Sequence, residues 1–437
     1  MIFLVLGFFI WLYSMKHLQK SFLWFLVYKV FLVTNINILS IPGIPVLTLD
    51  MALTFWFFFR IYVNRKKYCQ IEMPYMRPML LVVGVYLLST VFAMVGFKTA
   101  FSAYIKDVCN ILLTAWMMWK VVNTDKDFIF FAKRLSVAIL VTCLYGIAEK
   151  MMQSNPLVAY EATLVSDATK AIDFNYGLED IYRGYRVQSV FEHAIGAGVN
   201  WGMYIIFVMY TLMKVRNKTF NFNNYPYYVL MLLCAACLFF TSCRGPILFL
   251  LIALLGLLDL KNKRFYGIFA VLIVVAVIGG LFLEETYINN LVSIFDSSYQ
   301  YKVGGSSSEQ RFDQMEGALA ITAQSPIWGL GYKFQSVMDY RMVHRLLGLE
   351  SIWLRTIVQF GFLGVVANLI LAYYMVIKIP LKYKQKYMIL FNAAYWVTAS
   401  LTSLPGMLLY LYYLINFFFI KQSEVYKLNL PKENYES

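Results

Sequence analysis

The chain has 437 residues, of which 60% are hydrophobic, 18% aromatic and only 14% charged, and its formal net charge is +14. Soluble globular domains are about a quarter charged, so this composition excludes collagen-like, disordered, coiled-coil and small disulfide-framed proteins and argues strongly against a soluble multidomain enzyme. The fold class that remains is all-α, a polytopic transmembrane helical bundle.

Apolar stretches long enough to cross a bilayer follow one another along the chain. A membrane-spanning helix needs about 20 mostly apolar residues. By this measure the candidates lie near residues 1–15, 21–39, 44–63, 78–97, 100–119, 128–149, 191–214, 227–243, 245–260, 264–283, 351–377, 387–403 and 404–421. Pro405 could make the last two stretches one broken element, so the sequence predicts twelve or thirteen spans.

Lysine and arginine residues are concentrated in alternate short connections between these stretches. They are Lys16 and Lys20; Arg65, Lys66 and Lys67; Lys120 and Lys126; Lys214, Arg216 and Lys218; Lys261, Lys263 and Arg264; and Lys378, Lys382, Lys384 and Lys386. Cytoplasmic loops of membrane proteins carry an excess of such residues, so we predict that these connections face the cytoplasm. The two long polar segments then face outward, and the positive charge is explained without a nucleic-acid partner.

The order of these segments divides the chain into five parts. They are N-terminal transmembrane helices at 1–149, a first extracytoplasmic loop at 150–190, central transmembrane helices at 191–283, a large extracytoplasmic loop at 284–350, and C-terminal transmembrane helices with a cytoplasmic tail at 351–437. Within the large loop, residues 309–324 have helical spacing. One side of that helix contains Phe312, Met315, Leu319 and Ala323. We predict a short amphipathic helix that lies over the outer surface of the bundle.

Arg244 lies between two apolar runs, at the predicted outer end of both. An ionisable side chain at membrane depth costs about 2.5–3.5 kcal/mol on insertion scales, and it is tolerated mainly where it faces a polar cavity. Arg244 could simply reach the lipid headgroups. Alternatively it binds an anion, because Gly245 and Pro246 open the next helix, whose first N–H groups and positive dipole lie at the same point.

A second charged segment leads into a predicted span. It contains Arg183, Arg186 and His193 and continues into small residues, including Gly198 and Gly202. We assign the two glycines to close helix packing. Arginine is the preferred bidentate partner of phosphate and diphosphate, so the two arginines are candidate ligands of such a group.

Two histidines lie near the predicted outer face. His193 leads an apolar stretch, and His344 precedes the segment that contains Glu350 and Arg355. An imidazole with an ordinary pKa of about 6.5 can take or give a proton at neutral pH. Each histidine could equally be structural or solvated, and both interpretations stay open.

The sequence contains no recognisable motif for a metal or a nucleotide cofactor. The outer loops have no Asp-x-Asp, there is no pair of histidines with metal-ligand spacing, and there is no glycine-rich phosphate loop. Cys234 and Cys237 have metal-like spacing, but they lie in the apolar run 229–240 without a companion pair, so we assign them to helix packing. We therefore expect no metal and no cofactor. A diphosphate leaving group would then need cationic side chains to neutralise its charge.

Several short motifs, in this order, resemble the bacterial O-antigen ligase/polymerase family. They are RVQSVFEH at 186–193, TSCRG at 241–245, the stretch from Arg311 through Pro326 to GLG at 329–331, and His344 followed by ESIWL at 350–354 and GFLG at 361–364. The resemblance covers about residues 180–370. It implies a membrane glycosyltransferase that transfers a glycan from undecaprenyl diphosphate to a hydroxyl acceptor without a metal, with residues 284–350 as the catalytic loop.

The resemblance also implies roles for individual residues. The diphosphate-binding arginines of the family correspond to Arg186 and Arg244, with Arg311 as a third, and the general base of its loop corresponds to His344. We add Glu350 as a second catalytic candidate. Possible supporting residues are Arg183, His193 and Arg355.

Our leading hypothesis is a polysaccharide polymerase of the O-antigen or capsule type in the bacterial inner (plasma) membrane, with its active site facing the periplasm or exterior. Its partners would be the undecaprenyl-diphosphate-linked oligosaccharide, the lipid bilayer, a chain-length regulator and a flippase, and no nucleic acid. One alternative is a ligase that moves the glycan to lipid A-core or another acceptor. The other alternative is a lipid-linked oligosaccharide flippase or transporter, for which Lys29, Arg60 and Lys106 are candidate charges within the bundle.

Overall fold

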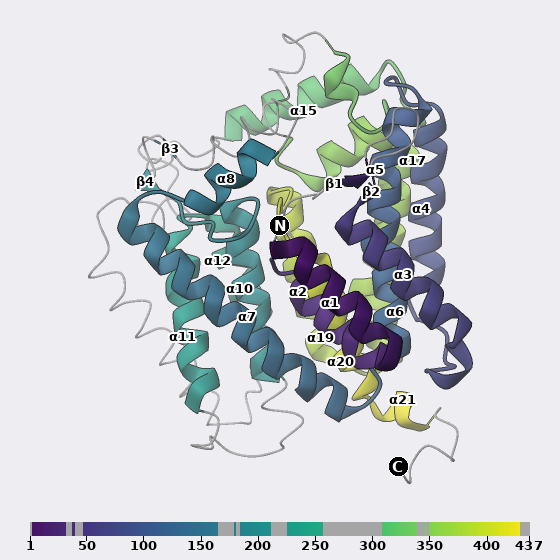
Figure 1. Ribbon diagram of the computed structural model, residues 1–437. Helices are drawn as coiled ribbons and strands as arrows, with labels where there is room; N and C mark the ends of the chain where they lie inside the picture. The colour runs from purple at the N-terminus through teal and green to yellow at the C-terminus, as the bar shows by residue number, and fades with distance from the viewer. Residues whose placement is uncertain are drawn as a thin grey trace.

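The computed structural model describes residues 2–31, 37–39, 47–164, 179–180, 184–210, 225–256, 308–338, 346 and 349–428. Within these residues the fold is almost entirely helical, which confirms the predicted all-α character (Figure 1). Two antiparallel pairs of short strands are β1 (Asn37–Leu39) with β2 (Leu47–Thr48) and β3 (Glu179–Asp180) with β4 (Gly184–Tyr185). The predicted apolar stretch at 264–283 lies outside the described residues.

Most helices of the first half follow the predicted apolar stretches. The second helix ends well before residue 39, and α8 lies in the segment 150–190, which was predicted as a loop. The helices of the first half are α1 (Ile2–Lys16), α2 (Leu18–Tyr28), α3 (Leu49–Val63), α4 (Met76–Val91), α5 (Phe97–Asp107), α6 (Thr114–Val121), α7 (Asp125–Met152) and α8 (Pro156–Leu164). A 3-10 turn, η1 (Arg65–Lys67), follows α3, and a π-helix, η2 (Val108–Leu113), joins α5 to α6.

The second half adds the remaining helices. They are α10 (Ala194–Tyr210), α11 (Tyr225–Phe240), α12 (Arg244–Leu255), α15 (Ser308–Thr322), α17 (Ile352–Tyr373), α18 (Ile379–Lys382), α19 (Lys386–Leu401), α20 (Leu409–Lys421) and α21 (Glu424–Leu428), with the short turns η6 (Phe334–Ser336) and η7 (Tyr374–Lys378). Pro405 lies between α19 and α20, so these are two helices rather than one broken element.

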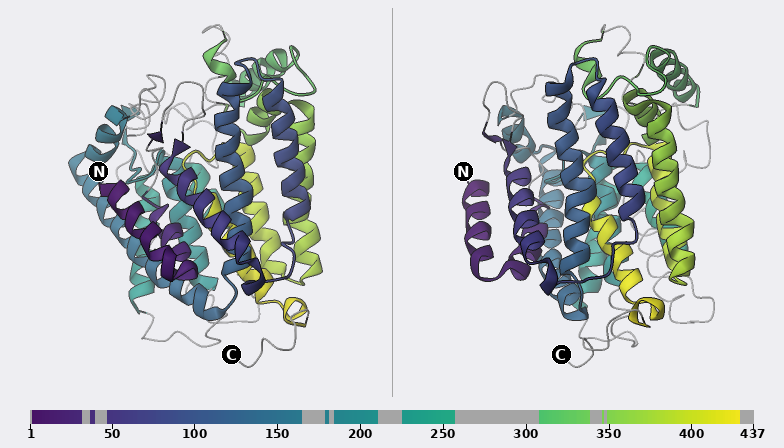
Figure 2. Two further views of the ribbon diagram at one scale, coloured as in Figure 1. Left: turned by 45° about the vertical axis from the view of Figure 1, so that its right-hand side comes forward. Right: turned by 90° about the vertical axis from the view of Figure 1, so that its right-hand side faces the viewer.

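Two helices are long and apolar enough to cross a membrane by themselves: α7, and α17 continued through α18 to Lys382. The other apolar helices of the described part are shorter, such as α10 and α20. The helices run in roughly the same direction through the molecule, and α8 and α15 lie at the end opposite α21 (Figures 1 and 2).

Two lysines, at the ends of α6 and α20, donate hydrogen bonds close to α21. Lys421 Nζ donates hydrogen bonds to the carbonyl oxygen of Trp119, at 2.7 Å, and to Asn123 Oδ1, at 2.8 Å. Lys120 Nζ donates to the carbonyl oxygen of Cys69 at 2.6 Å. The ends of α6 and α20 that carry these lysines therefore lie together.

Helix α17 is interrupted at Gly361, and residues 326–331 fill the interruption. The backbone N–H groups of Leu330 and Gly331 donate to the carbonyl oxygens of Val358 and Gln359, at 2.8 and 2.9 Å. Phe362 N donates in turn to the carbonyl oxygen of Pro326 at 2.8 Å. Broken helical backbone needs such partners wherever water cannot supply them, so residues 326–331 and the break in α17 stabilise each other.

Two glycines make this approach possible. Gly329 and Gly361 have φ values of 72° and 63°, in the region that side chains other than glycine rarely adopt. A Cβ atom on Gly329 would lie 2.4 Å from the carbonyl carbon of Gln359, and one on Gly361 would lie 2.3 Å from the carbonyl oxygen of Ile327. The glycine motifs at 329–331 and 361–364 are therefore two halves of one backbone junction.

The helix predicted at 309–324 is present as α15, which packs against α17. Its packed side differs from the apolar side seen in the sequence. Phe312, Met315 and Leu319 are 67%, 42% and 50% exposed. The buried side contains Gln314, Ala318, Ile321 and Thr322. The contact is thus mixed: Ala318 and Ile321 join an apolar cluster, while Gln314 and Thr322 are polar.

Candidate active site

The segment that carries Arg186 lies directly on the turn that carries Arg244. Val187 N donates a hydrogen bond to the carbonyl oxygen of Phe240 at 3.1 Å. Arg186 is 8% exposed, and its Nη2 donates to Cys243 Sγ at 2.7 Å. Its Nε donates to the carbonyl oxygen of Thr241 at 3.4 Å. The fold thus brings together two predicted site segments that are more than 50 residues apart; we call residues 241–244 the arginine turn.

Arg244 is half-buried and is the first residue of α12. The residue before it, Cys243, has extended backbone and makes no side-chain cap bond to the helix. The first N–H groups of a helix have no partner within the helix, and the helix dipole adds positive potential there. Arg244 is therefore attached at the positive end of the α12 dipole.

Neighbouring helices enclose the arginine turn. A Cβ atom on Gly198 of α10 would lie 2.7 Å from Cβ of Pro246, and one on Gly245 would lie 3.0 Å from Cγ2 of Thr402. A Cβ atom on Gly202 would lie 3.4 Å from the ring of Phe249. The assignment of Gly198 and Gly202 to close helix packing is thereby confirmed, and this packing fixes the first turn of α12.

Glu149, near the end of α7, holds the segment that carries Arg186. Its Oε1 accepts hydrogen bonds from Tyr185 Oη at 3.0 Å and from Gln188 N at 3.2 Å, and its Oε2 accepts one from Ser189 N at 2.6 Å. Glu149 is fully buried. Three hydrogen bonds, all accepted by the carboxyl group, fit its ionised form, which can accept hydrogen bonds but not donate them. The sequence analysis missed this residue, although an acid near the end of a long apolar helix is itself a signal.

Replacing Glu149 with glutamine is expected to destabilise the protein. The amide NH₂ group would take the place of one carboxylate oxygen, which in the wild type accepts a hydrogen bond from a backbone N–H group. Leaving buried donors unsatisfied costs about 1–3 kcal/mol for each group. The measurement is the melting temperature of the purified protein in detergent. Glu316→Gln, on the exposed side of α15, is the matched control. Equal melting temperatures for the two variants would contradict the role of Glu149.

His193 lies just before α10 and beside the same segment. Its Nδ1 accepts a hydrogen bond from Ile195 N at 3.0 Å, so its side chain caps the start of the helix. A nitrogen that accepts a hydrogen bond carries no proton, so only Nε2 of His193 can be protonated. The imidazole is therefore neutral while this hydrogen bond is made. A Cβ atom on Gly406 would lie 3.2 Å from His193 N, so the connection between α19 and α20 covers this residue.

The other predicted site residues belong to the outer loop and α17. Arg311 is exposed on α15, Arg355 is exposed near the start of α17, and Glu350 is half-buried just before that helix. Leu346 and Leu349 are buried in an apolar cluster under α15 with Ala318, Ile321, Leu330, Phe334 and Val358. This cluster anchors the chain next to Glu350. His344 and Arg183 lie outside the described residues.

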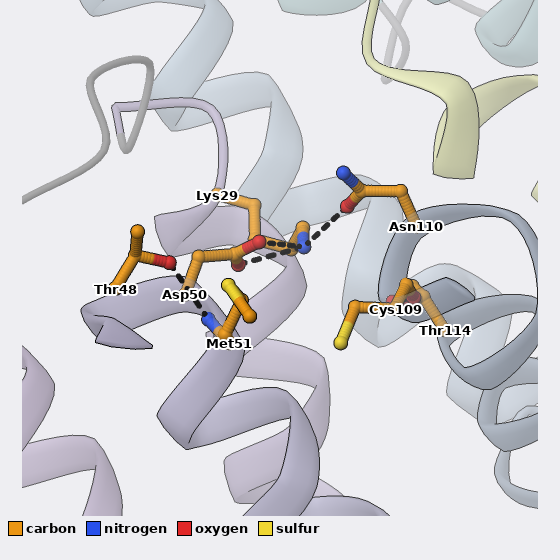
Figure 3. Close-up of polar contacts among 7 residues, drawn as sticks. All are labelled: Lys29, Thr48, Asp50, Met51, Cys109, Asn110 and Thr114. Atoms are coloured by element: carbon orange, nitrogen blue, oxygen red, sulfur yellow. Dashed lines mark hydrogen bonds and ion pairs between the residues drawn. The ribbon is translucent and has the colours of Figure 1, made fainter. Parts of the chain in front are cut away.

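An ion pair between Lys29 and Asp50 lies within the N-terminal helices. Lys29 Nζ lies 2.7 and 2.9 Å from the two carboxylate oxygens of Asp50 and 3.4 Å from Asn110 Oδ1 (Figure 3). The ion pair ties the end of α2 to the start of α3 and to η2. Lys29, one of the charges considered for a transport path, thus has a structural role.

Within the part of the chain that the structure describes, no three histidine, cysteine or acidic side chains form a group that could hold a metal ion. A family model described as O-antigen ligase matches residues 229–369. Residues 229–369 form an O-antigen ligase family domain. The comparison with curated proteins finds no match. The match confirms the resemblance drawn from the motifs.

The O-antigen ligase domain contains only part of the site. Arg244, Arg311, His344, Glu350 and Arg355 lie within the matched residues. Arg186 and Glu149 precede them in the chain. The fold brings Arg186 onto the arginine turn and Glu149 against the segment that carries Arg186. The site is therefore completed by helices that the family match does not include.

Proposed function

We propose that the protein is a polysaccharide polymerase that joins undecaprenyl-diphosphate-linked oligosaccharide repeat units at the outer face of the bacterial cytoplasmic membrane. The observation that carries the proposal is the placement of Arg186 on the arginine turn, beside Arg244 and the start of α12. The O-antigen ligase family match supports the general class of reaction.

Exposed side chains support a multi-pass membrane location. Large apolar residues are exposed on several helices, among them Phe9 at 61%, Phe59 at 60%, Val137 at 64% and Phe362 at 63%. Apolar surface on this scale is rarely left in water, whereas lipid tails solvate it well. The lysine-bearing ends of α6 and α20 near α21 would be cytoplasmic, and the arginine turn would then face outward.

The proposed reaction is an inverting glycosyl transfer. A hydroxyl oxygen of the acceptor repeat unit attacks the anomeric carbon of the donor glycan. The bond from that carbon to the diphosphate oxygen breaks, and undecaprenyl diphosphate leaves with both bonding electrons. The hydroxyl proton passes to a general base, for which His344 and Glu350 are the candidates.

Charge neutralisation by arginine is the reason to propose a metal-independent reaction. The departing diphosphate gains negative charge as the bond breaks, and groups held in place to receive that charge lower the barrier. Arg186 is fixed by two side-chain hydrogen bonds, so little reorganisation is needed at that moment. Arg311 is the proposed third cation.

A ligase is the second candidate, because the matched family model is described as O-antigen ligase. The two activities share the donor and the arginine site and differ in the acceptor, which would be lipid A-core or another carrier for a ligase. The family match gives no support to the flippase alternative.

Analysis of the product separates the two candidates. Purified protein is incubated with a lipid-linked oligosaccharide in the presence of a chelator, and the glycan is resolved by length and by carrier. We expect a ladder of longer glycans on the same lipid diphosphate. Transfer only to an added lipid A-core acceptor would identify a ligase, and a product that requires added metal would overturn the metal-independent mechanism.

A further inference from the structure

Among the described residues, the two segments that carry Arg186 and Arg244 each contain a buried polar atom without a hydrogen-bond partner. These atoms are the side-chain nitrogen of Gln188 and the hydroxyl oxygen of Ser242. Gln188 is 1% exposed and Ser242 is 6% exposed, so bulk water does not satisfy them. Buried polar atoms of this kind are rare in native proteins, and each requires an explanation.

Gln188 lies on the same side of its segment as Arg186. Val187 points toward α7, because its Cγ1 would lie 3.2 Å from a Cβ atom on Gly146. Arg186 points the other way, onto the arginine turn. Successive side chains alternate along an extended segment, so Gln188, two residues after Arg186, faces the turn as well.

Ser242 belongs to the arginine turn itself. It has a positive φ of 52° and is followed by Cys243, the partner of Arg186 Nη2. The backbone on both sides is fixed: Ser242 N donates to the carbonyl oxygen of Phe239 at 3.0 Å, and Cys243 N donates to Thr241 Oγ1 at 3.3 Å. The Ser242 hydroxyl is therefore held in a defined place without a partner.

We propose that Gln188 Nε2 and Ser242 Oγ are neutral hydrogen-bond donors to the diphosphate that Arg186 and Arg244 hold. The inference rests on the proposed function for the identity of this group. Each of the two segments then supplies one cation and one neutral donor. The hydrogen bond that Gln188 N donates to Glu149 Oε1 positions Arg186 and Gln188. The start of α12 positions Ser242 and Arg244.

The two roles these atoms could have predict the same effect on stability but different effects on binding. If an atom is only an unsatisfied buried group, its replacement by an apolar group of similar shape is neutral or stabilising and does not change binding. If it is a ligand of the diphosphate, the same replacement leaves stability unchanged or higher but weakens binding. Hydrogen bonds to charged groups contribute about 1.5–3 kcal/mol, which corresponds to about 10–100-fold in affinity for each donor.

The test uses the purified full-length variants Ser242→Ala and Gln188→Met and the control Thr54→Val. Thr54, on α3, is fully buried, and its hydroxyl likewise has no partner. The probe is a short-chain polyprenyl diphosphate, and its dissociation constant is taken from the rise in melting temperature with concentration. We expect about 10–100-fold weaker binding for each site variant, melting temperatures without probe at or above the wild-type value, and unchanged binding for Thr54→Val.

Wild-type affinity in both site variants would overturn the inference, as would a wild-type protein that the probe does not stabilise. A fall in the melting temperature of both variants without probe would also overturn it, because the two atoms would then have structural partners. Glycan transfer is measured separately on the same preparations. If the wild type binds the probe but makes no polymer, the proposed function fails, while the assignment of the two donors is still decided by the binding data.

Discussion

Replacement of Arg244 by alanine is expected to slow polymer formation by about 10²–10³-fold, the usual cost of removing one group that stabilises charge in a transition state. The variant keeps the start of α12 and the Arg186 contacts to Thr241 and Cys243, so the expected loss is in rate rather than in folding. The measurement is the length distribution of polysaccharide in cells that produce the variant at the wild-type level.

Two further variants separate this effect from a general loss of charge. Arg244→Lys keeps the charge but not the planar fork that binds a diphosphate at two points, and an intermediate loss is expected. Arg60→Ala removes an arginine that lies over the Trp56 ring of α3, 5.4 Å from its centre, and it should leave the chain length unchanged. Long-chain polysaccharide from Arg244→Ala at normal abundance would refute the role of Arg244.

Replacement of Gly361 by alanine is expected to destabilise the protein strongly. A side chain at a φ of 63° costs about 1–3 kcal/mol in backbone strain. The new Cβ atom, 2.3 Å from the carbonyl oxygen of Ile327, adds about 1–3 kcal/mol through overpacking. The junction between α17 and residues 326–331 should open, and the melting temperature and the amount of protein in the membrane should both fall.

Gly84→Ala is the matched control for this experiment. Gly84 lies in α4, and a Cβ atom on it would have no neighbour within 4 Å. Alanine favours a helix over glycine by about 1 kcal/mol, so this variant should be neutral or slightly stabilised. A Gly361→Ala protein as stable as the Gly84→Ala protein would show that the junction contributes nothing.

The helices could be predicted from the sequence because their signal is local. The predicted stretch at 128–149 corresponds to α7 and that at 387–403 to α19, since a long apolar run has few alternatives to a helix. The interruption of α17 could not be predicted in this way. Gly361 lies within an apolar run, and only the backbone of residues 326–331, far away in the sequence, satisfies the groups that the break exposes.

The site could be predicted in part. An arginine at the end of an apolar run can be recognised in the sequence as a candidate functional residue, because a charged group at membrane depth is energetically costly. This argument indicated Arg186 and Arg244. It did not find Glu149, because its role depends on which backbone N–H groups the fold brings to it. Nor could it predict that Gln188 Nε2 and Ser242 Oγ lack hydrogen-bond partners among the described residues, because this depends on the burial and contacts of the folded chain.

The most direct measurement is a structure of the protein with a polyprenyl diphosphate bound. The account predicts that the phosphate oxygens lie within hydrogen-bond distance of the Arg186 and Arg244 guanidinium groups, with the polyprenyl chain leaving toward the lipid. A diphosphate bound elsewhere, for example at the Lys29–Asp50 pair, with the arginine turn untouched, would contradict it.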